Sequence, residues 1–283
     1  MILDGKKIKE EILDELKNKV SCLDKKPNLC VIQVGNDPAS DVYIKQKEKM
    51  CSYIGYNFIH KKLDENITQE KILSIIDELN NDDDITSILV QMPIPNHLDS
   101  KEIQNRVFKE KDVDGLNDDN IIDLINKKDS LIPCTAYGII ELLDRYKISV
   151  EGKDIVIIGR SFLVGMPLFH LLENKNATVT LCHSKTKNLK EKTLHADILV
   201  VAVGKKHLVT EDMVKDDAIV IDVGINRENN KLYGDVDFDN IKNKASYITP
   251  VPGGVGPMTI ASLAKNVLKS QEIQKEKTLV KKI

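Results

Sequence analysis

The chain has 283 residues, of which 41% are hydrophobic and 30% charged, with a formal net charge of −3. The length favours two domains, and the small net charge excludes a general electrostatic attraction to nucleic acid. We expect neither a signal peptide nor a membrane-spanning stretch. The five cysteines and six histidines are scattered without disulfide or metal-ligand spacing, which indicates a reduced, cytoplasmic, metal-free protein.

The first half of the chain alternates between helical and strand patterns. Apolar residues at helical spacing predict an amphipathic helix over residues 6–20, and a β-rich run over 28–34 ends at a glycine. Asp37 and Pro38 predict the N-cap and first position of a second helix, which Gly55 should end. A further helix is predicted over 68–79 and a buried strand over 85–90. This alternation indicates a parallel sheet with helices on its faces.

The second half gives a clearer βαβ series, reached through a loop at Pro133 and a helix from about Tyr137. Apolar strands are predicted over 154–158, 177–182, 196–203 and 217–223, and the first is followed by a glycine-containing turn and a helix over 166–172. The series predicts a doubly wound nucleotide-binding domain. The chain then divides into a first domain (1–136), completed by a C-terminal helical segment (258–283) that packs back on it, and a second domain (137–257).

The turn over residues 159–165 is the candidate phosphate-binding element. It departs from the usual G-x-G-x-x-G pattern, because Ser161 takes the second glycine position and Gly165 comes one residue late. Its place after a strand and before a helix suits backbone amides that cradle phosphate, with Gly159 at the tight turn. The alternative is an ordinary strand-to-helix turn.

Charge separates the two nicotinamide coenzymes. An NAD site usually places an acidic residue at the end of the second strand, but residues 182–187 contain no acid. Arg160 in the turn and Ser184 after the strand could instead hold a ribose phosphate. Lys185 and Lys187 could equally be plain surface lysines. NADP is therefore favoured over NAD.

Tyr43 and Lys47 lie four residues apart on the helix after Asp37, so they share one face. A helical lysine is ordinarily solvent-exposed. The Tyr-x-x-x-Lys spacing also matches the catalytic pair of short-chain dehydrogenases, but in that family the pair follows the glycine-rich turn on the same sheet. Here it precedes the turn by more than a hundred residues, and this order rejects that assignment.

Three loops add candidate groups. Residues 90–95 expose the Gln91 amide among prolines, and residues 111–115 place two acids and a glycine in a turn. Taken singly, each could be a plain surface loop. Residues 249–259 contain three glycines and three prolines, a composition suited to a rigid loop whose backbone approaches a flat ligand.

Taken together, these motifs resemble the methylenetetrahydrofolate dehydrogenase/methenyltetrahydrofolate cyclohydrolase family. The resemblance extends over nearly the whole chain. One departure is Ala136, where the family loop usually has proline, and this loss should loosen the loop without removing a chemical group. The matching segments are residues 3–6, 38–47, 90–93, 111–115, 133–135, 159–161, 182–184, 222–226 and 250–259.

The resemblance implies an N-terminal α/β catalytic domain and a doubly wound Rossmann-type NADP-binding domain, with folate in the cleft between them. It also implies roles that chemistry can check. The Asp114 carboxylate would accept from the pterin, Tyr43 would stack on the folate, and Lys47, oriented by Gln91, would activate water or shuttle the proton. Pro252, Gly253 and Gly256 would line the opposite wall, Gly159, Arg160, Ser161 and Ser184 would hold the cofactor, and backbone near Ile225 would meet its nicotinamide half.

Two alternatives stay open at this point. A family member could retain only the dehydrogenase or only the cyclohydrolase activity, because the same cleft serves both steps. A non-catalytic NADP-binding sensor is the other, although a pure binder needs neither Lys47 nor Gln91 nor Asp114. The resemblance further suggests a homodimer that acts on tetrahydrofolate derivatives and supplies formyl units, as for purine synthesis.

Overall fold

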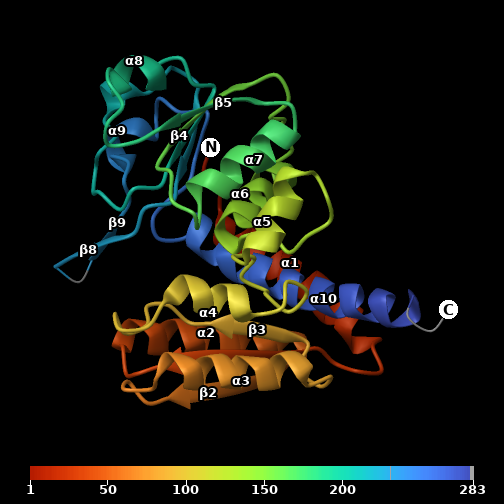
Figure 1. The fold of residues 1–283 in the computed structure, drawn as a ribbon. Coiled ribbons are helices and arrows are strands. Elements are labelled where there is room, and N and C mark those ends of the chain that lie inside the picture. The colour runs from red at the N-terminus through yellow and green to blue at the C-terminus, as the bar shows by residue number, and fades with distance from the viewer. Residues whose placement is uncertain (230, 281–283) are drawn as a thin grey trace. The chain divides into compact units, whose positions relative to one another are not determined.

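The computed structural model describes residues 1–229 and 231–280, and its chain forms two α/β units (Figure 1). Of the described residues, the five-stranded unit comprises 1–10, 135–229 and 231–259, and the three-stranded unit comprises 11–134 and 260–280. The expected α/β class with parallel sheets is confirmed. The division predicted from the sequence placed residues 1–10 in the first domain, whereas contacts group them with residues 135–259.

The three-stranded unit is built on a parallel sheet of order β2-β1-β3. Strand β1 is buried along nearly its whole length, as expected for a parallel strand covered on both faces. Its Cys30 and Ile32 pack with Ile72 and Ile76 of α3 in one apolar cluster. The elements are β1 (Asn28–Val34), α2 (Pro38–Ile54), β2 (Asn57–Leu63), α3 (Gln69–Asn81), β3 (Ser87–Val90), α4 (Ser100–Arg106) and α5 (Asp118–Ile125).

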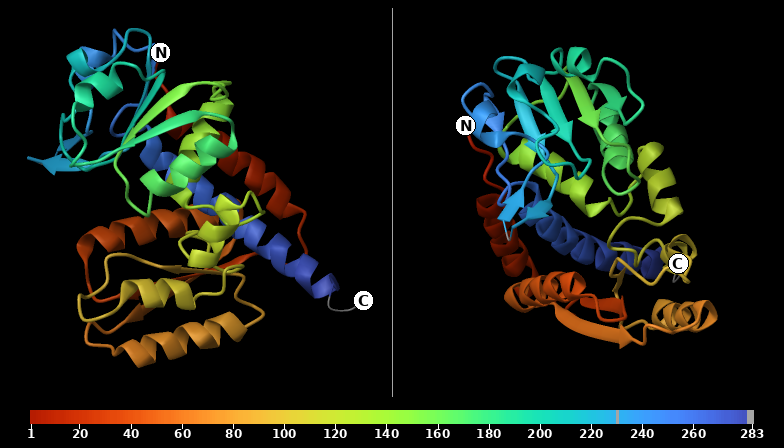
Figure 2. Two further views of the ribbon diagram at one scale, coloured as in Figure 1. Left: turned by 45° about the horizontal axis from the view of Figure 1, so that its top comes forward. Right: turned by 90° about the vertical axis from the view of Figure 1, so that its left-hand side faces the viewer.

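The five-stranded unit carries a parallel sheet of order β10-β7-β6-β4-β5, which Figure 2 shows from two further directions. The chain leaves β4 for β5 on one side and later returns to β6 on the other. The switch point, where ligands bind in doubly wound sheets, therefore lies between β4 and β6. The strands are β4 (Asp154–Ile158), β5 (Thr178–Cys182), β6 (Ile198–Val201), β7 (Ile219–Asp222) and β10 (Tyr247–Ile248), with a β8 (Asn226–Glu228) and β9 (Lys231–Tyr233) hairpin.

Helices of the five-stranded unit include α7 (Gly165–Asn174), α8 (Leu189–Thr193) and α9 (Phe238–Ile241), and a 3₁₀ turn covers Glu211–Met213. Three more helices contribute residues to both units: α1 (Gly5–Ser21), α6 (Cys134–Arg145) and α10 (Val255–Val280). From residue 260, α10 belongs to the three-stranded unit, as predicted for the C-terminal helix. Residues 281–283 of that predicted segment lie outside the described residues. Among the described residues, no helix is long and apolar enough to span a membrane.

The helix caps of α2 follow the sequence signals. The Asp37 side chain accepts a hydrogen bond from the Ser40 N–H, Pro38 is the first helical residue, and Gly55 ends the helix with a φ of 95°. Elsewhere the ends differ, because α6 begins at Cys134 rather than near Tyr137 and α10 begins at Val255. The sequence patterns did not predict β2, β10, α4, α5 or the β8–β9 hairpin.

Candidate active site

The candidate catalytic group of the three-stranded unit is a buried hydrogen bond between a lysine and a glutamine. Lys47 Nζ donates to Gln91 Oε1 at 2.6 Å, and the two residues are 9% and 7% exposed. Gln91 directly follows β3, and its backbone N–H donates to the Ile32 carbonyl at 2.8 Å, which extends the ladder between β3 and β1. Its Nε2 donates to the Met92 carbonyl at 2.6 Å. With Nε2 committed to that carbonyl, the amide oxygen is directed at Lys47.

Burial shifts the proton affinity of this lysine. Desolvation lowers the pKa of Lys47 below its usual value, while the Asp114 carboxylate and then Cys134 oppose the shift. Desolvating an ammonium costs roughly several kcal/mol, and one charge-assisted hydrogen bond returns about 1.5–3 kcal/mol, so burial prevails. A lysine of lowered pKa has more neutral amine at physiological pH and can therefore accept a proton.

Asp114 lies in a tight turn of the three-stranded unit. Burial raises the pKa of Asp114, while the Lys47 charge and a hydrogen bond with Cys134 lower it. The next residue, Gly115, has a φ of 72°, and a Cβ there would lie 2.4 Å from the Ile132 carbonyl carbon. Only glycine fits, because the positive φ and the close backbone both exclude a side chain.

The C-terminal helix holds this turn from the other side. Asn266 on α10 is fully buried, and its Nδ2 donates to the Val113 carbonyl at 2.9 Å and to the Ile132 carbonyl at 2.8 Å. One turn later, Ser270 donates to the carbonyl of Glu110. Two polar side chains of α10 thus satisfy buried carbonyls that a turn cannot pair internally, and they fix the backbone beside Asp114.

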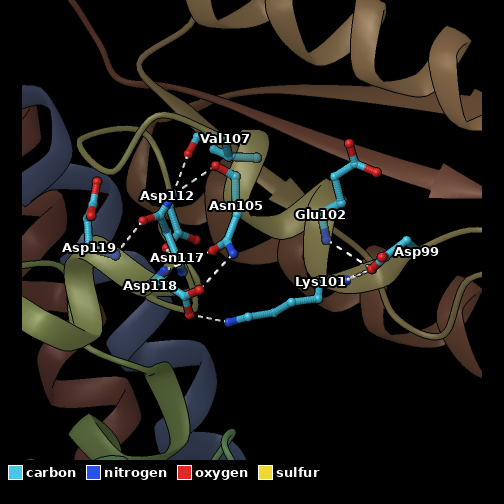
Figure 3. Close-up of polar contacts among 9 residues, drawn as sticks. All are labelled: Asp99, Lys101, Glu102, Asn105, Val107, Asp112, Asn117, Asp118 and Asp119. Atoms are coloured by element: carbon cyan, nitrogen blue, oxygen red, sulfur yellow. Dashed lines mark hydrogen bonds and ion pairs between the residues drawn. The ribbon is translucent and has the colours of Figure 1, made fainter.

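A second buried carboxylate, Asp112, belongs to the same turn. Asp112 Oδ2 accepts from the Asn117 N–H at 2.7 Å and from Asn120 Nδ2 at 3.0 Å. Asn117 Nδ2 in turn donates to the Val107 carbonyl at 2.9 Å, and Figure 3 shows Asp112 and Asn117 with the neighbouring polar residues of α4 and the start of α5. Burial raises the pKa of Asp112 to about 6. Because backbone and amide donors already bond to the Asp112 carboxylate, we infer that Asp112 supports the turn. It is not a candidate for the carboxylate that binds substrate.

Tyr43 lies one helical turn before Lys47 and is 45% exposed. Its ring is thus accessible on the same face of α2 as the amine, as stacking on a flat ligand requires. The stacking role stays a prediction.

The turn after β4 is as tight as a phosphate-binding turn needs to be. Gly159 has a φ of 120°, and a Cβ on it would lie 2.3 Å from the Ala202 carbonyl oxygen. A Cβ on Gly165 would lie 2.0 Å from the Gly159 oxygen. Ser161 Oγ accepts from the Val164 N–H at 3.2 Å. The serine thus stabilises the turn at the place where the common fingerprint has glycine.

The other predicted cofactor residues also lie in the five-stranded unit. Arg160 and Ser161 follow β4 and Ser184 follows the adjacent β5, and all three are exposed at the carboxyl ends of those strands. Ile225 follows β7 and is 52% exposed. These positions fit a dinucleotide lying across the switch point, although their contacts with a cofactor stay a prediction.

The proline–glycine loop packs on the start of the chain within the five-stranded unit. The Lys6 N–H donates to the Gly253 carbonyl at 3.1 Å, and a Cβ on Gly5 would lie 1.8 Å from the Gly254 oxygen. Gly256 faces open space. The contact explains why residues 3–6 matter to this loop, while the substrate-wall role of Pro252, Gly253 and Gly256 stays a prediction.

The structure therefore brings Lys47, Gln91 and Asp114 together in one unit, with Tyr43 one turn away. The sequence patterns did not predict roles for Asp112 or Asn266. The role of Asn266 could have been inferred because it is a polar residue on the buried face of the last helix. Ala136 lies buried in the first turn of α6 rather than in a loop. The expected loop location is therefore wrong, and the position suits either residue because both proline and alanine fit the first turn of a helix.

Comparison with known proteins now decides the family. Residues 3–114 match the family model for the tetrahydrofolate dehydrogenase/cyclohydrolase catalytic domain, and residues 133–275 match that for its NAD(P)-binding domain. The chain belongs to this family. The resemblance inferred from the sequence motifs is confirmed.

Relatives of known name cover almost the whole chain. The bifunctional protein FolD of Lachnoclostridium phytofermentans is 52% identical over 94% of this chain and 96% of its own, and that of Bacillus subtilis is 48% identical over 95% and 96%. The FolD crystal structure from Campylobacter jejuni has a TM-score of 0.95 at 46% identity, covering 97% of this chain and 99% of its own. The Trypanosoma brucei enzyme, complexed with NADP and an inhibitor, has a TM-score of 0.92 at 34% identity, covering 97% and 98%.

The support from α10 can be tested with Asn266→Ala. The change removes the amide donor of the buried Ile132 carbonyl and leaves the Val113 carbonyl with only the weaker Cys134 thiol, so we expect the free energy of unfolding to fall by about 1–3 kcal/mol. Urea denaturation followed by circular dichroism measures the change, with the exposed Asn66→Ala as the matched control. Equal stability of the two variants would contradict the supporting role of Asn266.

The tightness of the turn after β4 can be tested with Gly159→Ala. A methyl group there meets the Ala202 carbonyl and must adopt an unfavourable φ, so the turn has to open. We expect at least a tenfold weaker binding of NADPH, roughly 1.4 kcal/mol or more, measured by fluorescence titration. Gly152→Ala is the control, because its φ of 69° is also positive but its Cβ meets nothing. Equal NADPH affinity in both variants would show that the close approach does not matter.

Proposed function

We propose that this protein oxidises 5,10-methylenetetrahydrofolate to 5,10-methenyltetrahydrofolate with NADP and then hydrolyses the product to 10-formyltetrahydrofolate. The observation that carries the proposal is the buried hydrogen bond between Lys47 and Gln91 beside Asp114. It occurs in a chain that belongs to the tetrahydrofolate dehydrogenase/cyclohydrolase family over both of its domains. A protein that only bound NADP would have no use for a desolvated lysine in the other unit.

The oxidation places few chemical demands on the side chains. NADP would supply the acceptor of the hydride that leaves the methylene carbon. Because the product is a cation stabilised by its flanking nitrogens, no side chain has to take a proton in this step. The side chains therefore have only to bind the substrate and cofactor and to orient their reacting carbons. Asp114 is suited to accept hydrogen bonds from the pterin, and Tyr43 to stack on the flat part of the substrate.

The hydrolysis does require proton transfer. Water adds to the methenyl carbon and gives one proton to the neutral amine of Lys47. The ring C–N bond then opens, the departing nitrogen receives a proton, and the hydroxyl on the carbon loses its remaining proton to become the formyl oxygen, so one net proton is released. Gln91 holds Lys47 in place through its amide oxygen. A cationic substrate further favours the neutral amine, because like charges lower the pKa of a lysine.

The cofactor assignment rests on the five-stranded unit. Arg160 is exposed in the turn after β4, and no acid follows β5 where an NAD site would have one. The related Trypanosoma brucei structure is a complex with NADP. The family resemblance supports four further proposals: a homodimer, a cytoplasmic setting, a domain division at residue 136, and a one-carbon role in purine, histidine and methionine biosynthesis. The near-neutral charge supports the absence of nucleic-acid partners.

Incubating the purified protein with 5,10-methylenetetrahydrofolate and NADP tests the proposal, with reduced cofactor and methenyl product recorded together. We expect NADPH to form while little methenyl compound accumulates beyond a control for spontaneous hydrolysis. Stoichiometric methenyl accumulation would leave a dehydrogenase alone. Binding of NADPH without turnover of either substrate would contradict the proposal and indicate a sensor, and faster reaction with NAD would contradict the cofactor assignment.

A further inference from the structure

Asp235 is a buried carboxylate on which several backbone donors of the five-stranded unit converge. It is fully buried, and its Oδ2 accepts from the N–H groups of Val203 at 2.7 Å and Gly204 at 3.0 Å. Its Oδ1 accepts from the Lys205 N–H at 2.7 Å and from Asn226 Nδ2 at 3.0 Å. Three successive amides therefore form a nest around one carboxylate, which fixes the loop that follows β6.

The position of Asp235 is itself fixed by a second buried carboxylate. Asp222 Oδ1 accepts from the Asp235 N–H at 2.9 Å and from the Gly224 N–H at 3.0 Å. A Cβ on Gly224 would lie 2.1 Å from the Asp235 carboxylate, and one on Gly234 would lie 1.7 Å from Asp222 Oδ2. The two glycines permit the two acids to approach the backbone, so the loops after β6 and β7 are tied into one rigid arrangement.

The loop that Asp235 holds lies at the switch point of the sheet. It follows β6, the neighbour of β4, and the turn after β4 approaches it so closely that a Cβ on Gly159 would touch the Ala202 carbonyl. Val203 in this loop is 39% exposed, and Ile225, next to the Asn226 that Asp235 also holds, is 52% exposed. Exposed apolar residues on a rigid backbone at this edge suit one face of a planar ring such as nicotinamide.

We propose that Asp235 is a positioning residue for the nicotinamide half of the cofactor, acting through the loops 203–205 and 224–226 without touching the cofactor itself. The inference rests on the proposed function and deepens it, because it assigns the geometry of hydride transfer to a carboxylate outside the glycine-rich turn. The hydrolysis step takes no hydride, so it does not depend on Asp235.

The two activities provide the test. Asp235→Asn replaces one acceptor oxygen by a donor and turns it toward backbone N–H groups, whereas Asp235→Ala removes all four hydrogen bonds. We expect the KM for NADP to rise and kcat of the dehydrogenase step to fall, about tenfold for Asn and more for Ala. Hydrolysis of supplied methenyltetrahydrofolate should stay within about twofold of the parent rate. Asp239→Asn, at an exposed carboxylate paired with Lys242, is the control.

Two outcomes would overturn the proposal: an unchanged dehydrogenase step in the Asn variant, or an equal loss of both activities, which would mark Asp235 as merely structural. NADPH titration of the same proteins measures the effect independently of turnover, so a parent without activity would sink the proposed function and still leave this inference testable.

A double-mutant cycle with Gly224→Ala adds a second readout. In the parent, the new methyl group collides with the Asp235 carboxylate, so NADPH affinity should fall. In the Asp235→Ala background that collision is gone, and the same change should cost at least threefold less affinity, roughly 0.6 kcal/mol. Additive effects would contradict direct contact between the carboxylate and the loop after β7.

Discussion

Burial of the Lys47 amine is the constraint on which the proposed chemistry depends. An exposed lysine is protonated at neutral pH and cannot accept a proton, whereas desolvation lowers the pKa of Lys47 and makes the neutral amine accessible. The surrounding groups limit this effect without reversing it. The hydrogen bond to the Gln91 oxygen keeps the amine in place, and the Asp114 carboxylate favours its charged form, so the lysine can both take up and return a proton.

Both units position their functional loops with buried polar side chains that bond to backbone. In the three-stranded unit, Asp112 and Asn266 hold the turn that carries Asp114. In the five-stranded unit, Asp235 and Asp222 hold the loops after β6 and β7. A buried unpaired backbone group costs roughly 1–3 kcal/mol, which makes each such loop adopt one geometry. Glycines complete the arrangement, because they let carboxylates and carbonyls approach where any side chain would collide.

Much of this was predictable from the sequence. The strand patterns gave the doubly wound sheet, and the cap of α2 was predicted to the residue because Asp37, Pro38 and Gly55 act through local backbone chemistry. Lys47, Gln91 and Asp114 followed from the family resemblance and lie together. The supporting roles of Asp235 and Asn266 were not predicted, because their hydrogen-bond partners are distant in sequence and no local pattern indicates them. Strand β2 was not predicted because it lies at a sheet edge, where exposed and half-buried residues alternate without an apolar run.

The most direct measurement is the rate at which Lys47→Met hydrolyses methenyltetrahydrofolate supplied without NADP, compared with the parent. Methionine keeps most of the buried volume but has no amine. We predict a loss of at least about a hundredfold, the usual contribution of a positioned acid–base group. The affinity for NADPH should stay unchanged, because the cofactor residues lie in the other unit. Hydrolysis at the parent rate by a folded variant that still binds NADPH would contradict the role of Lys47 in proton transfer.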